Sequence, residues 1–543
     1  MADSHEYIAS LDDVKIGKNV LESLTRSAYD DCRCILREYV QNAADQIDIA
    51  REQNLSEGNS YGVYINISPE TRRIEIEDNA TGVEASEVLP VLRNVACSNK
   101  KRGKQKGFRG IGRLGGLGYC STLTFITSFK GEDVRSILKW NADEMSRIID
   151  DESDESSASD VVSRVTSHST EKEKPDLHYF KIIMEDVSDR RLLDAGNIRD
   201  YLSMVAPVDI ANTFKPFKDE IKRFMKENNL VVDTYDVYVN GEQIYKPYTR
   251  SIYDENGAEI DKIYKVVPFI RNDSLGNPFY WGWYGVSKLE GMLKFKNLAR
   301  GIRLRCKNIQ LGDEGNCRRF LPGKQDQRFS DYFFGEIHTL SELLIPDMDR
   351  NYLRVDDART EFEALARKDF ATLKNLCYEA SGYKSDYKKI LTAQEKGKKL
   401  EEKKKNKEFA SKEELAKAQD EFEKSKKLAE SAEKSIAKRK QNLQTENSPL
   451  AGVIDTSYDP TPISLSAVVS GFGPKPEEKP SEIKDSAGDE EYGCLRTSKP
   501  IYKRFNKSTL AVINAVYKVI GDVLPMENMR EALISKIEAE ITK

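Results

Sequence analysis

The sequence is short of the features that mark membrane and secreted proteins. None of its apolar runs approaches the roughly 20 residues that a membrane-spanning helix needs. Its first residues, Met1 to Glu6, lack the basic and apolar segments of a signal peptide. These absences predict a cytoplasmic protein that does not contact a membrane.

Metal-binding patterns and an excess of positive charge are also missing. The chain of 543 residues has eight scattered cysteines and four histidines, and the C-x-C pair of Cys32 and Cys34 makes a poor zinc site. We therefore expect free thiols in a reducing compartment. Lysine and arginine number 85 and aspartate and glutamate 90, so the net charge of −5 provides no general basic excess for nucleic acid.

The first of three polar motifs that are present lies on a predicted helix. Apolar residues recur with helical spacing from Val20 to Ala50, and Glu38, Asn42 and Asp45 stand at positions i, i+4 and i+7. This spacing places the three side chains on one helical face. Two carboxylates and an amide suit an oxygen-liganded cation such as Mg²⁺. An exposed polar helix face has the same pattern.

The second motif follows a predicted strand. Ile74 and Ile76 alternate with polar residues, and the strand is broken by the segment Asp78-Asn79-Ala80-Thr81-Gly82. An acid and an amide at a strand end, followed by glycine, favour a sharp turn that directs a carboxylate into a cleft. An ordinary hairpin turn has a similar composition.

The third motif is a run of glycines between residues 107 and 118. Glycine stands at positions 107, 110, 112, 115, 116 and 118, and Lys100, Lys101, Arg102 and Lys104 precede the run. Glycine-rich turns let backbone N–H groups approach a phosphate closely. The run has neither the P-loop spacing nor the dinucleotide-binding fingerprint, so it is a weak signal when taken alone.

In this order and at this spacing, the three motifs resemble the ATP site of the superfamily that unites DNA gyrase, the ninety-kilodalton heat-shock chaperone, sensor histidine kinases and MutL. Its boxes read Glu-x3-Asn-x2-Asp and Asp-x-Gly-x-Gly, followed by a glycine-rich lid. The resemblance implies an α+β protein that uses ATP and Mg²⁺. Its first domain would be a two-layer α/β sandwich, the Bergerat ATP-binding fold, in a layout closest to the heat-shock chaperones.

The resemblance also implies roles for individual residues. Glu38 would be the general base that orients the attacking water, Asn42 would bind Mg²⁺, and Asp45 would support the water shell of the metal. Asp78 would accept a hydrogen bond from the adenine amino group. The other positions expected to bind the nucleotide are Asn79, Gly82, Lys100, Lys101, Gly110, Gly112, Gly115 and Gly118.

The chain departs from the family pattern at three points. Ala80 stands where the second box usually has its first glycine, and we expect the turn to survive unless that site needs a positive φ. The lid is one residue out of step with the heat-shock pattern, and its Gly107-Phe108-Arg109-Gly110 resembles the MutL lid instead. No clear equivalent is found of the threonine that the family often places on a late strand.

Two domains are expected in the part of the chain that resembles the superfamily. The ATP-binding domain would cover residues 1–229, with a flexible acidic insertion at 143–176. A transducer-like α/β domain would cover residues 230–380 and include a hairpin with an Asn240-Gly241 turn.

In this superfamily the second domain sends a basic residue to the γ-phosphate. The loop 344–352 resembles the equivalent loop of the heat-shock chaperone, so Arg350 is the expected catalytic residue. Arg354 and Lys307 are alternatives. A surface arginine in a salt bridge is as good an interpretation for each of the three.

The C-terminal part carries no recognisable motif. Apolar residues recur every seven positions in the Lys/Glu/Ala-rich segment 381–445, which predicts a long helix or coiled coil, either an intramolecular hairpin or a dimer contact. Residues 446–500 are expected to be a disordered linker. Residues 501–543 are expected to hold two amphipathic helices, 508–520 and 526–541, that contact a partner chain.

The sequence favours a slow, Mg²⁺-dependent ATPase in which ATP closes the lid and rearranges the domains or a homodimer. It would act as a chaperone-like or regulatory ATPase on a protein partner or client, and a bacterial defence system is one setting. The alternative is a DNA-acting clamp like MutL or MORC proteins, which the lid favours and the net acidity opposes. A module that holds ATP without hydrolysing it is a third hypothesis, which the presence of Glu38 opposes.

Overall fold

The structure is a computed structural model that describes residues 16–25, 31–55, 60–95, 112–347, 349–457, 513, 516–517 and 533–539. The chain divides into two compact units, Met1–Ser470 and Gly471–Lys543. The described residues of the second unit are helical. Most of the predicted linker and of the predicted C-terminal helix pair lies outside the described residues.

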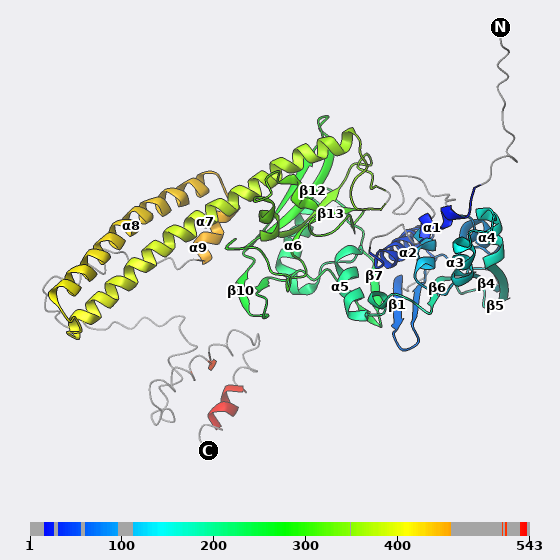
Figure 1. Ribbon diagram of the computed structural model, residues 1–543, viewed down its shortest axis with the longest axis horizontal. Helices are drawn as coiled ribbons and strands as arrows, with labels where there is room; N and C mark the ends of the chain where they lie inside the picture. The colour runs from blue at the N-terminus through cyan, green and yellow to red at the C-terminus, as the bar shows by residue number, and fades with distance from the viewer. Residues whose placement is uncertain are drawn as a thin grey trace, which may run out of the picture. The chain divides into compact units, whose positions relative to one another are not determined.

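An eight-stranded sheet forms the N-terminal part of the first unit (Figure 1). Its strands lie in the order β5-β4-β3-β6-β2-β1-β7-β8, and neighbours are antiparallel except β1 and β7, which are parallel. The strands are β1 Gly62–Ser68, β2 Arg73–Asp78, β3 Thr122–Ser128, β4 Val134–Asn141, β5 Thr166–Lys172, β6 Tyr179–Glu185, β7 Asp236–Val239 and β8 Glu242–Gln243.

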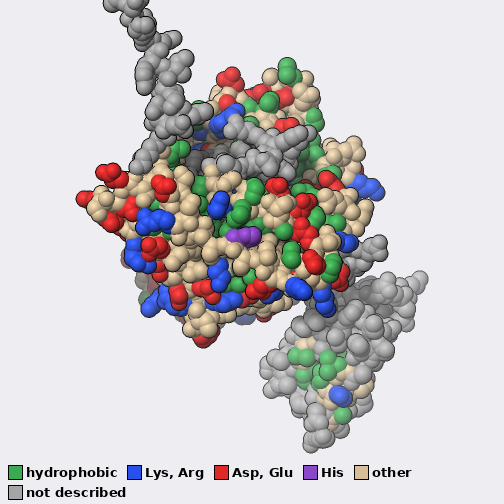
Figure 2. Space-filling model, turned by 90° about the vertical axis from the view of Figure 1, so that its right-hand side faces the viewer, with side chains coloured by type: hydrophobic (Ala, Val, Ile, Leu, Met, Phe, Trp, Pro, Cys, Tyr) green, Lys and Arg blue, Asp and Glu red, His purple; other side chains and the backbone are tan. Residues whose placement is uncertain are grey.

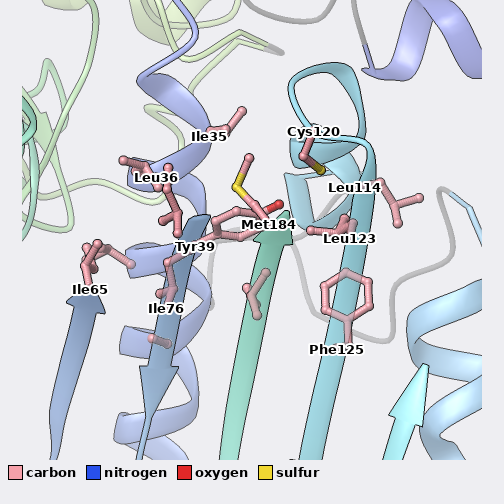
Figure 3. Close-up of a cluster of buried hydrophobic side chains, with 14 of the residues drawn as sticks. Ile35, Leu36, Tyr39, Ile65, Ile76, Leu114, Cys120, Leu123, Phe125 and Met184 are labelled. Atoms are coloured by element: carbon pink, nitrogen blue, oxygen red, sulfur yellow. The ribbon is translucent and has the colours of Figure 1, made fainter. Parts of the chain in front are cut away.

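Helices cover one face of this sheet and share a core with it. Figure 3 shows Ile35, Leu36 and Tyr39 of one helix pointing toward apolar side chains of the strands. The strand residues alternate as expected, with Ile74 and Ile76 of β2 buried. The expected two-layer α/β sandwich is confirmed. The α-helices of this part are α1 Asn19–Thr25, α2 Cys34–Glu52, α3 Ala142–Asp150, α4 Ala158–Val165 and α5 Ala195–Val205. Helix α6, Lys215–Glu227, instead shares a core with Trp281 and Trp283.

The segment 143–176, expected as a flexible insertion, forms regular elements instead. It contains most of α3, all of α4 and β5, and β5 is an edge strand paired with β4. The start of α4 carries a capping box, in which Ser157 and Asp160 satisfy each other's backbone N–H groups. Val161 and Val165 of the same helix are buried. The expected flexibility is therefore not found, because Ser157 and Asp160 cap a helix whose apolar side chains are buried.

A second sheet of five strands follows, in the order β11-β12-β15-β13-β14. The hairpin with the Asn240-Gly241 turn is not part of it: β7 pairs with β1 and extends the first sheet. The expected boundary at residue 229 thus separates strands that share one sheet. The strands are β11 Lys265–Asn272, β12 Pro278–Val286, β13 Gly301–Cys306, β14 Ile309–Gln310 and β15 Phe334–Thr339, with a small separate pair β9 Ser251–Tyr253 and β10 Glu259–Lys262.

Two long helices leave the second sheet and pack against each other (Figure 1). They are α7, Asp357–Lys405, and α8, Lys412–Thr445, followed by the shorter α9, Pro449–Ser457. Ile390 and Ala393 of α7 pack against Ala429 and Ala432 of α8. Of the two arrangements left open by the heptad spacing, the structure has the intramolecular hairpin.

Two observations bear on the predicted environment of the chain. Among the described residues, no helix combines the length and the apolar character that crossing a bilayer requires. The six cysteines described in the structure are free thiols, as expected.

Candidate active site

The first polar motif lies on α2, the helix that packs against the sheet. Its apolar face is buried in the core, and Glu38, Asn42 and Asp45 follow the helical spacing. Glu38 is 8% exposed and Asp45 3%, whereas Asn42 is half-buried. The run from Val20 to Ala50, expected to be helical, is divided between α1 and α2, since residues 31–33 are not helical. The part that carries the motif is helical, and two of its three side chains are buried carboxyl groups rather than members of a solvated face.

The second motif forms a turn at the end of β2. Asp78 is buried, and its Oδ1 accepts a hydrogen bond from the backbone N–H of Ala80 at 3.1 Å. Ala80 is also buried and is not among the residues with positive φ. Alanine therefore fits where the family pattern has glycine, as expected, and the turn holds a carboxylate at the strand end.

At position 82 of the same turn, no residue other than glycine fits. The φ of Gly82 is +68°, a region that side chains with a Cβ rarely adopt. A Cβ at this position would lie 1.9 Å from the carbonyl oxygen of Ser128 at the end of β3. The glycine of the second motif therefore lets the turn pack directly against the end of β3.

Asn79 is engaged with the backbone next to it. Its Oδ1 accepts a hydrogen bond from the N–H of Gly62 at 2.8 Å, and its Nδ2 donates one to the carbonyl of Ser60 at 3.1 Å. The side chain thus fixes the start of β1 beside the turn. Its expected contact with the nucleotide stays a prediction.

The C-terminal part of the glycine-rich segment is the helical turn η4, Gly112–Gly118. A Cβ on Gly112 would lie 3.0 Å from Oε2 of Glu38, so the segment and the first motif are in direct proximity. Gly115 lies buried in η4, which ends at Gly118. The remaining expected phosphate-site residues, Lys100, Lys101 and Gly110, lie outside the described residues.

Tyr39, which sequence reasoning missed, connects η4 to α2. Its hydroxyl donates a hydrogen bond to the carbonyl of Arg113 at 3.2 Å and accepts one from the N–H of Gly116 at 3.1 Å. A Cβ on Gly116 would lie 2.5 Å from this hydroxyl, so glycine is required for the contact. The sequence feature that could have predicted this contact is the tyrosine next to Glu38 on a helix face that is otherwise aliphatic.

The loop of the second sheet brings Arg350 to Glu38. Arg350 is 6% exposed, and its Nε lies 3.5 Å from Oε1 of Glu38. The same oxygen accepts a hydrogen bond from Nη2 of Arg37 at 3.2 Å. Arg354, one of the two alternatives, instead pairs with Asp356 on the surface. Glu38 is therefore held between two guanidinium groups, one from each side of the domain junction.

The strands beside Asp78 show where a buried threonine lies. In the antiparallel register, Asp78 of β2 lies opposite Phe180 of β6, and Phe180 lies opposite Thr127 of β3. Thr127 is buried; its hydroxyl donates to the carbonyl of Tyr179 and accepts from the N–H of Val83. The chain thus has a phenylalanine next to Asp78, and its buried threonine stands one strand further away.

The oxygen-bearing side chains of α2 fit Mg²⁺ better than they fit a metal whose ligands all come from the protein. Within the described part of the chain, histidine, cysteine and acidic side chains form no cluster of three that could hold a metal. Mg²⁺ usually keeps several waters and takes one or two protein oxygens plus phosphate oxygens. The amide of Asn42, half-buried between Glu38 and Asp45 on α2, is a ligand of the kind that such a site uses.

Comparisons with known proteins agree with this geometry. A family model described as "Histidine kinase-, DNA gyrase B-, and HSP90-like ATPase" matches residues 33–171. Chaperone protein HtpG of Anaplasma phagocytophilum (strain HZ) is 31% identical over 122 residues, which are 20% of this chain and 19% of the relative. The HtpG of Vibrio atlanticus (strain LGP32) is 24% identical over 304 residues, 52% of this chain and 42% of the relative.

A third relative, HtpG of Francisella tularensis subsp. novicida (strain U112), is 27% identical over 143 residues, 23% of either chain. The chain thus spans less than half the length of the curated relatives it matches. Residues 33–171 are thus similar to the ATPase domain that histidine kinases, gyrase B and HSP90 have in common. The similarity to the HtpG of Vibrio atlanticus extends over about half of this chain, beyond the residues that the family model matches.

Proposed function

We propose that this chain binds ATP with Mg²⁺ and hydrolyses it slowly. The observation that supports the proposal most strongly is the position of Glu38, with one oxygen against Arg37 and Arg350 and the other toward Gly112 of η4. A carboxylate, a glycine-rich turn and a second-domain arginine are the parts that phosphoryl transfer needs, because the reaction depends mainly on positioning and charge stabilisation.

Each of these side chains has a distinct task in the proposed reaction. Glu38 orients the attacking water and accepts its proton. Arg350 stabilises the negative charge that develops on the transferred phosphoryl group. Asp78, fixed by the N–H of Ala80, accepts from the adenine amino group. Asn42 would hold Mg²⁺, which neutralises phosphate charge when bound, and Asp45 would support its waters.

Hydrolysis would be coupled to movement because the site draws on two sheets. Glu38 belongs to the helix of the first sheet, whereas Arg350 lies in a loop beyond the last strand of the second. Binding and release of the γ-phosphate would therefore change the contact between the two. By analogy with the superfamily, we propose closure of the lid, ATP-dependent homodimerisation and a cytoplasmic protein client or partner, with a role as a chaperone-like or regulatory ATPase, for example in bacterial defence.

A DNA-acting clamp is the second candidate. It is supported by four arginines of the second domain that come together on one cavity wall: Arg300, Arg303, Arg318 and Arg319. On the face shown in Figure 2, however, acidic and basic side chains of the described residues are interspersed without a broad basic surface. Phosphate contacts along DNA need such a surface, so the first candidate is preferred.

The proposed function is tested by nucleotide binding. Isothermal titration with a non-hydrolysable ATP analogue and Mg²⁺ should detect binding to the full chain and none to Asp78→Asn. The carboxylate has one oxygen for the N–H of Ala80 and a second for the adenine amino group, whereas the amide has a single acceptor oxygen. Glu144→Gln, a half-buried acid on α3 that pairs with Arg147, is the matched control and should bind as the unmodified chain does. Equal binding by Asp78→Asn would overturn the site assignment. The mass of the complex in solution, measured in parallel, should double on binding if ATP drives dimerisation.

A further inference from the structure

A cavity of about 1010 Å³ lies beside the proposed catalytic pair, within the first unit. One wall comes from the start of α2 and from α5, and the other from the loops around β13 and β14 and from the loop that carries Arg350. This volume is at the upper end of the roughly 300–1,000 Å³ of small-molecule sites. The proposed reaction does not use this space.

The basic side chains that line the cavity are all arginines, and five carboxylates line it as well. Six arginines line it: Arg33, Arg37, Arg300, Arg303, Arg318 and Arg319. Four of them pair with carboxylates: Arg33 with Asp31, Arg37 with Glu38, Arg318 with Asp331, and Arg300 with Glu314 and Asp331. Guanidinium groups in this number are typical of sites that bind phosphate, because their planar fork matches phosphate oxygens.

Two of the arginines have no carboxylate partner among the described residues. Arg303 is 5% exposed and donates only to neutral oxygens, including Oε1 of Gln310 at 3.1 Å and the carbonyl of Leu298 at 2.9 Å. Its Nε has no hydrogen-bond partner. Arg319 donates to the carbonyl of Asn316 and lies 3.8 Å from the ring centre of Tyr352.

A buried guanidinium without a paired anion is costly, because desolvation of the charge is not offset. An anion in the cavity would provide the missing partner for Arg303. The cavity is also lined by carboxylates that are not in the ion pairs named above, namely Asp200, Asp313 and Asp349. These acceptors favour a ligand that carries hydroxyl or amino donors in addition to its phosphate.

We propose that this cavity is a second ligand site, which binds a phosphate-bearing small molecule of nucleotide size. Arg303 and Arg319 bind the phosphate, and the amide and carboxylate groups around them bind its polar remainder. The site is distinct from the proposed ATP site, which lies between the turn after β2, α2 and η4.

The cavity reaches the catalytic pair from both sides. Arg37 lines it and donates to Glu38, and Asp349 and Asn351, which flank Arg350, line it as well. A ligand that orders these residues would therefore change the rate of ATP hydrolysis. This regulatory effect rests on the proposed ATPase function, whereas ligand binding by the cavity does not.

Inorganic tripolyphosphate is a suitable probe for the phosphate part of the site. The full chain is first saturated with a non-hydrolysable ATP analogue and Mg²⁺, so that the ATP site is occupied, and then titrated calorimetrically with tripolyphosphate. One further binding event is expected. Arg319→Gln, at an exposed position that lines the cavity, should weaken it about tenfold, the usual effect of one lost charge-assisted hydrogen bond. Arg303→Gln should weaken it more.

Arg367→Gln is the matched control, because it removes the same charge from an exposed arginine on α7 that pairs with Glu363. Unchanged binding by Arg319→Gln, or equal weakening by Arg367→Gln, would overturn the proposal, as would binding of a single-stranded oligonucleotide without binding of tripolyphosphate. Should the ATP analogue fail to bind, the proposed function fails. The same titration without the analogue then still tests the cavity.

Discussion

At the scale of single residues, Gly82 and Ala80 show how closely the turn after β2 is packed. Both stand at positions where the superfamily pattern has glycine, yet their environments differ. Ala80 has an ordinary backbone conformation and a buried methyl group, whereas Gly82 combines φ of +68° with backbone contact to Ser128. A substitution is therefore tolerated at the first position and not at the second.

Replacing Gly82 with alanine should destabilise the fold and abolish nucleotide binding. A Cβ 1.9 Å from the carbonyl oxygen of Ser128 forces the turn away from β3. Gly131→Ala is a suitable control, since Gly131 has φ of +98° but a Cβ added there would meet no atom within 4 Å. The control should lose about 1 kcal/mol for its backbone conformation alone. Gly82→Ala should lose about 2 kcal/mol more for the clash, measured by chemical unfolding.

Arg350→Ala should lower the rate of ATP hydrolysis while leaving ATP binding nearly intact. The guanidinium acts on charge that develops in the transition state, and removal of one such donor typically costs about 100-fold or more in kcat. Arg354→Ala removes a neighbouring arginine that pairs with Asp356 and should change kcat little. An equal loss in both variants would show that the loop as a whole matters, and not the contact of Arg350 with Glu38.

At the scale of elements, the side chain of Tyr39 on α2 holds η4 in place against α2. Helix α2 carries the proposed base, and η4 is the described end of the proposed lid. The phenol makes two hydrogen bonds to the backbone of η4, with Arg113 and Gly116. The position of the glycines relative to Glu38 is therefore set by a side chain next to Glu38 in sequence.

Tyr39→Phe should loosen the lid without unfolding the domain. Loss of the hydroxyl leaves the N–H of Gly116 without its acceptor, at a cost of about 1–2 kcal/mol. We expect faster hydrogen exchange at that amide and a several-fold higher KM for ATP. Tyr64→Phe, an exposed phenol on β1 that stacks on Tyr238, is the control and should leave both quantities unchanged. Unchanged exchange in Tyr39→Phe would show that η4 is held by other contacts.

The elements also show what could be predicted from the sequence. Periodicity located α2 and β2, and the spacing of Glu38, Asn42, Asp45 and Asp78 led to the superfamily, because these motifs are local. Contacts between distant segments were not accessible in this way. The parallel pairing of β7 with β1 depends on the whole chain, and the Tyr39 bonds depend on backbone positions 74 and 77 residues away. The capping box at Ser157 was local and could have been recognised.

At the scale of the whole first unit, a buried polar network joins the two sheets. Arg305 of β13 donates to Oε1 of Glu336 on β15 at 2.6 Å and to the carbonyl of Met204 in α5 at 2.5 Å. Lys246 donates to the other oxygen of Glu336 at 3.0 Å. Although burial raises the pKa of Glu336, Arg305 and Lys246 hold it well below the usual value. The network fixes the second sheet against the domain that carries Glu38.

This network should make the stability of the chain depend on pH. Burial lowers the pKa of His338, which contacts Glu336, from 6.5 to about 4. Between these values the unfolded chain binds a proton that the folded chain does not, so stability falls as the pH drops from 6.5 toward 4. We expect a loss on the order of 3 kcal/mol in unfolding free energy from this group.

Chemical unfolding at a series of pH values measures this loss. His338→Gln should reduce the slope of unfolding free energy against pH in that window, whereas His168→Gln, at an exposed position on β5, should keep it. The same slope in all three proteins would contradict the assignment to His338. Protonation of Glu336 adds a further loss only at lower pH.

The central claim is that Glu38 is the base of an ATPase. Steady-state hydrolysis of ATP with Mg²⁺, measured for the unmodified chain and for Glu38→Ala with binding recorded for both, tests it most directly. We predict slow turnover by the unmodified chain, and a variant that binds ATP but has lost hydrolysis by about 100-fold or more, as expected for the loss of a general base. Turnover by Glu38→Ala at the unmodified rate would contradict the account.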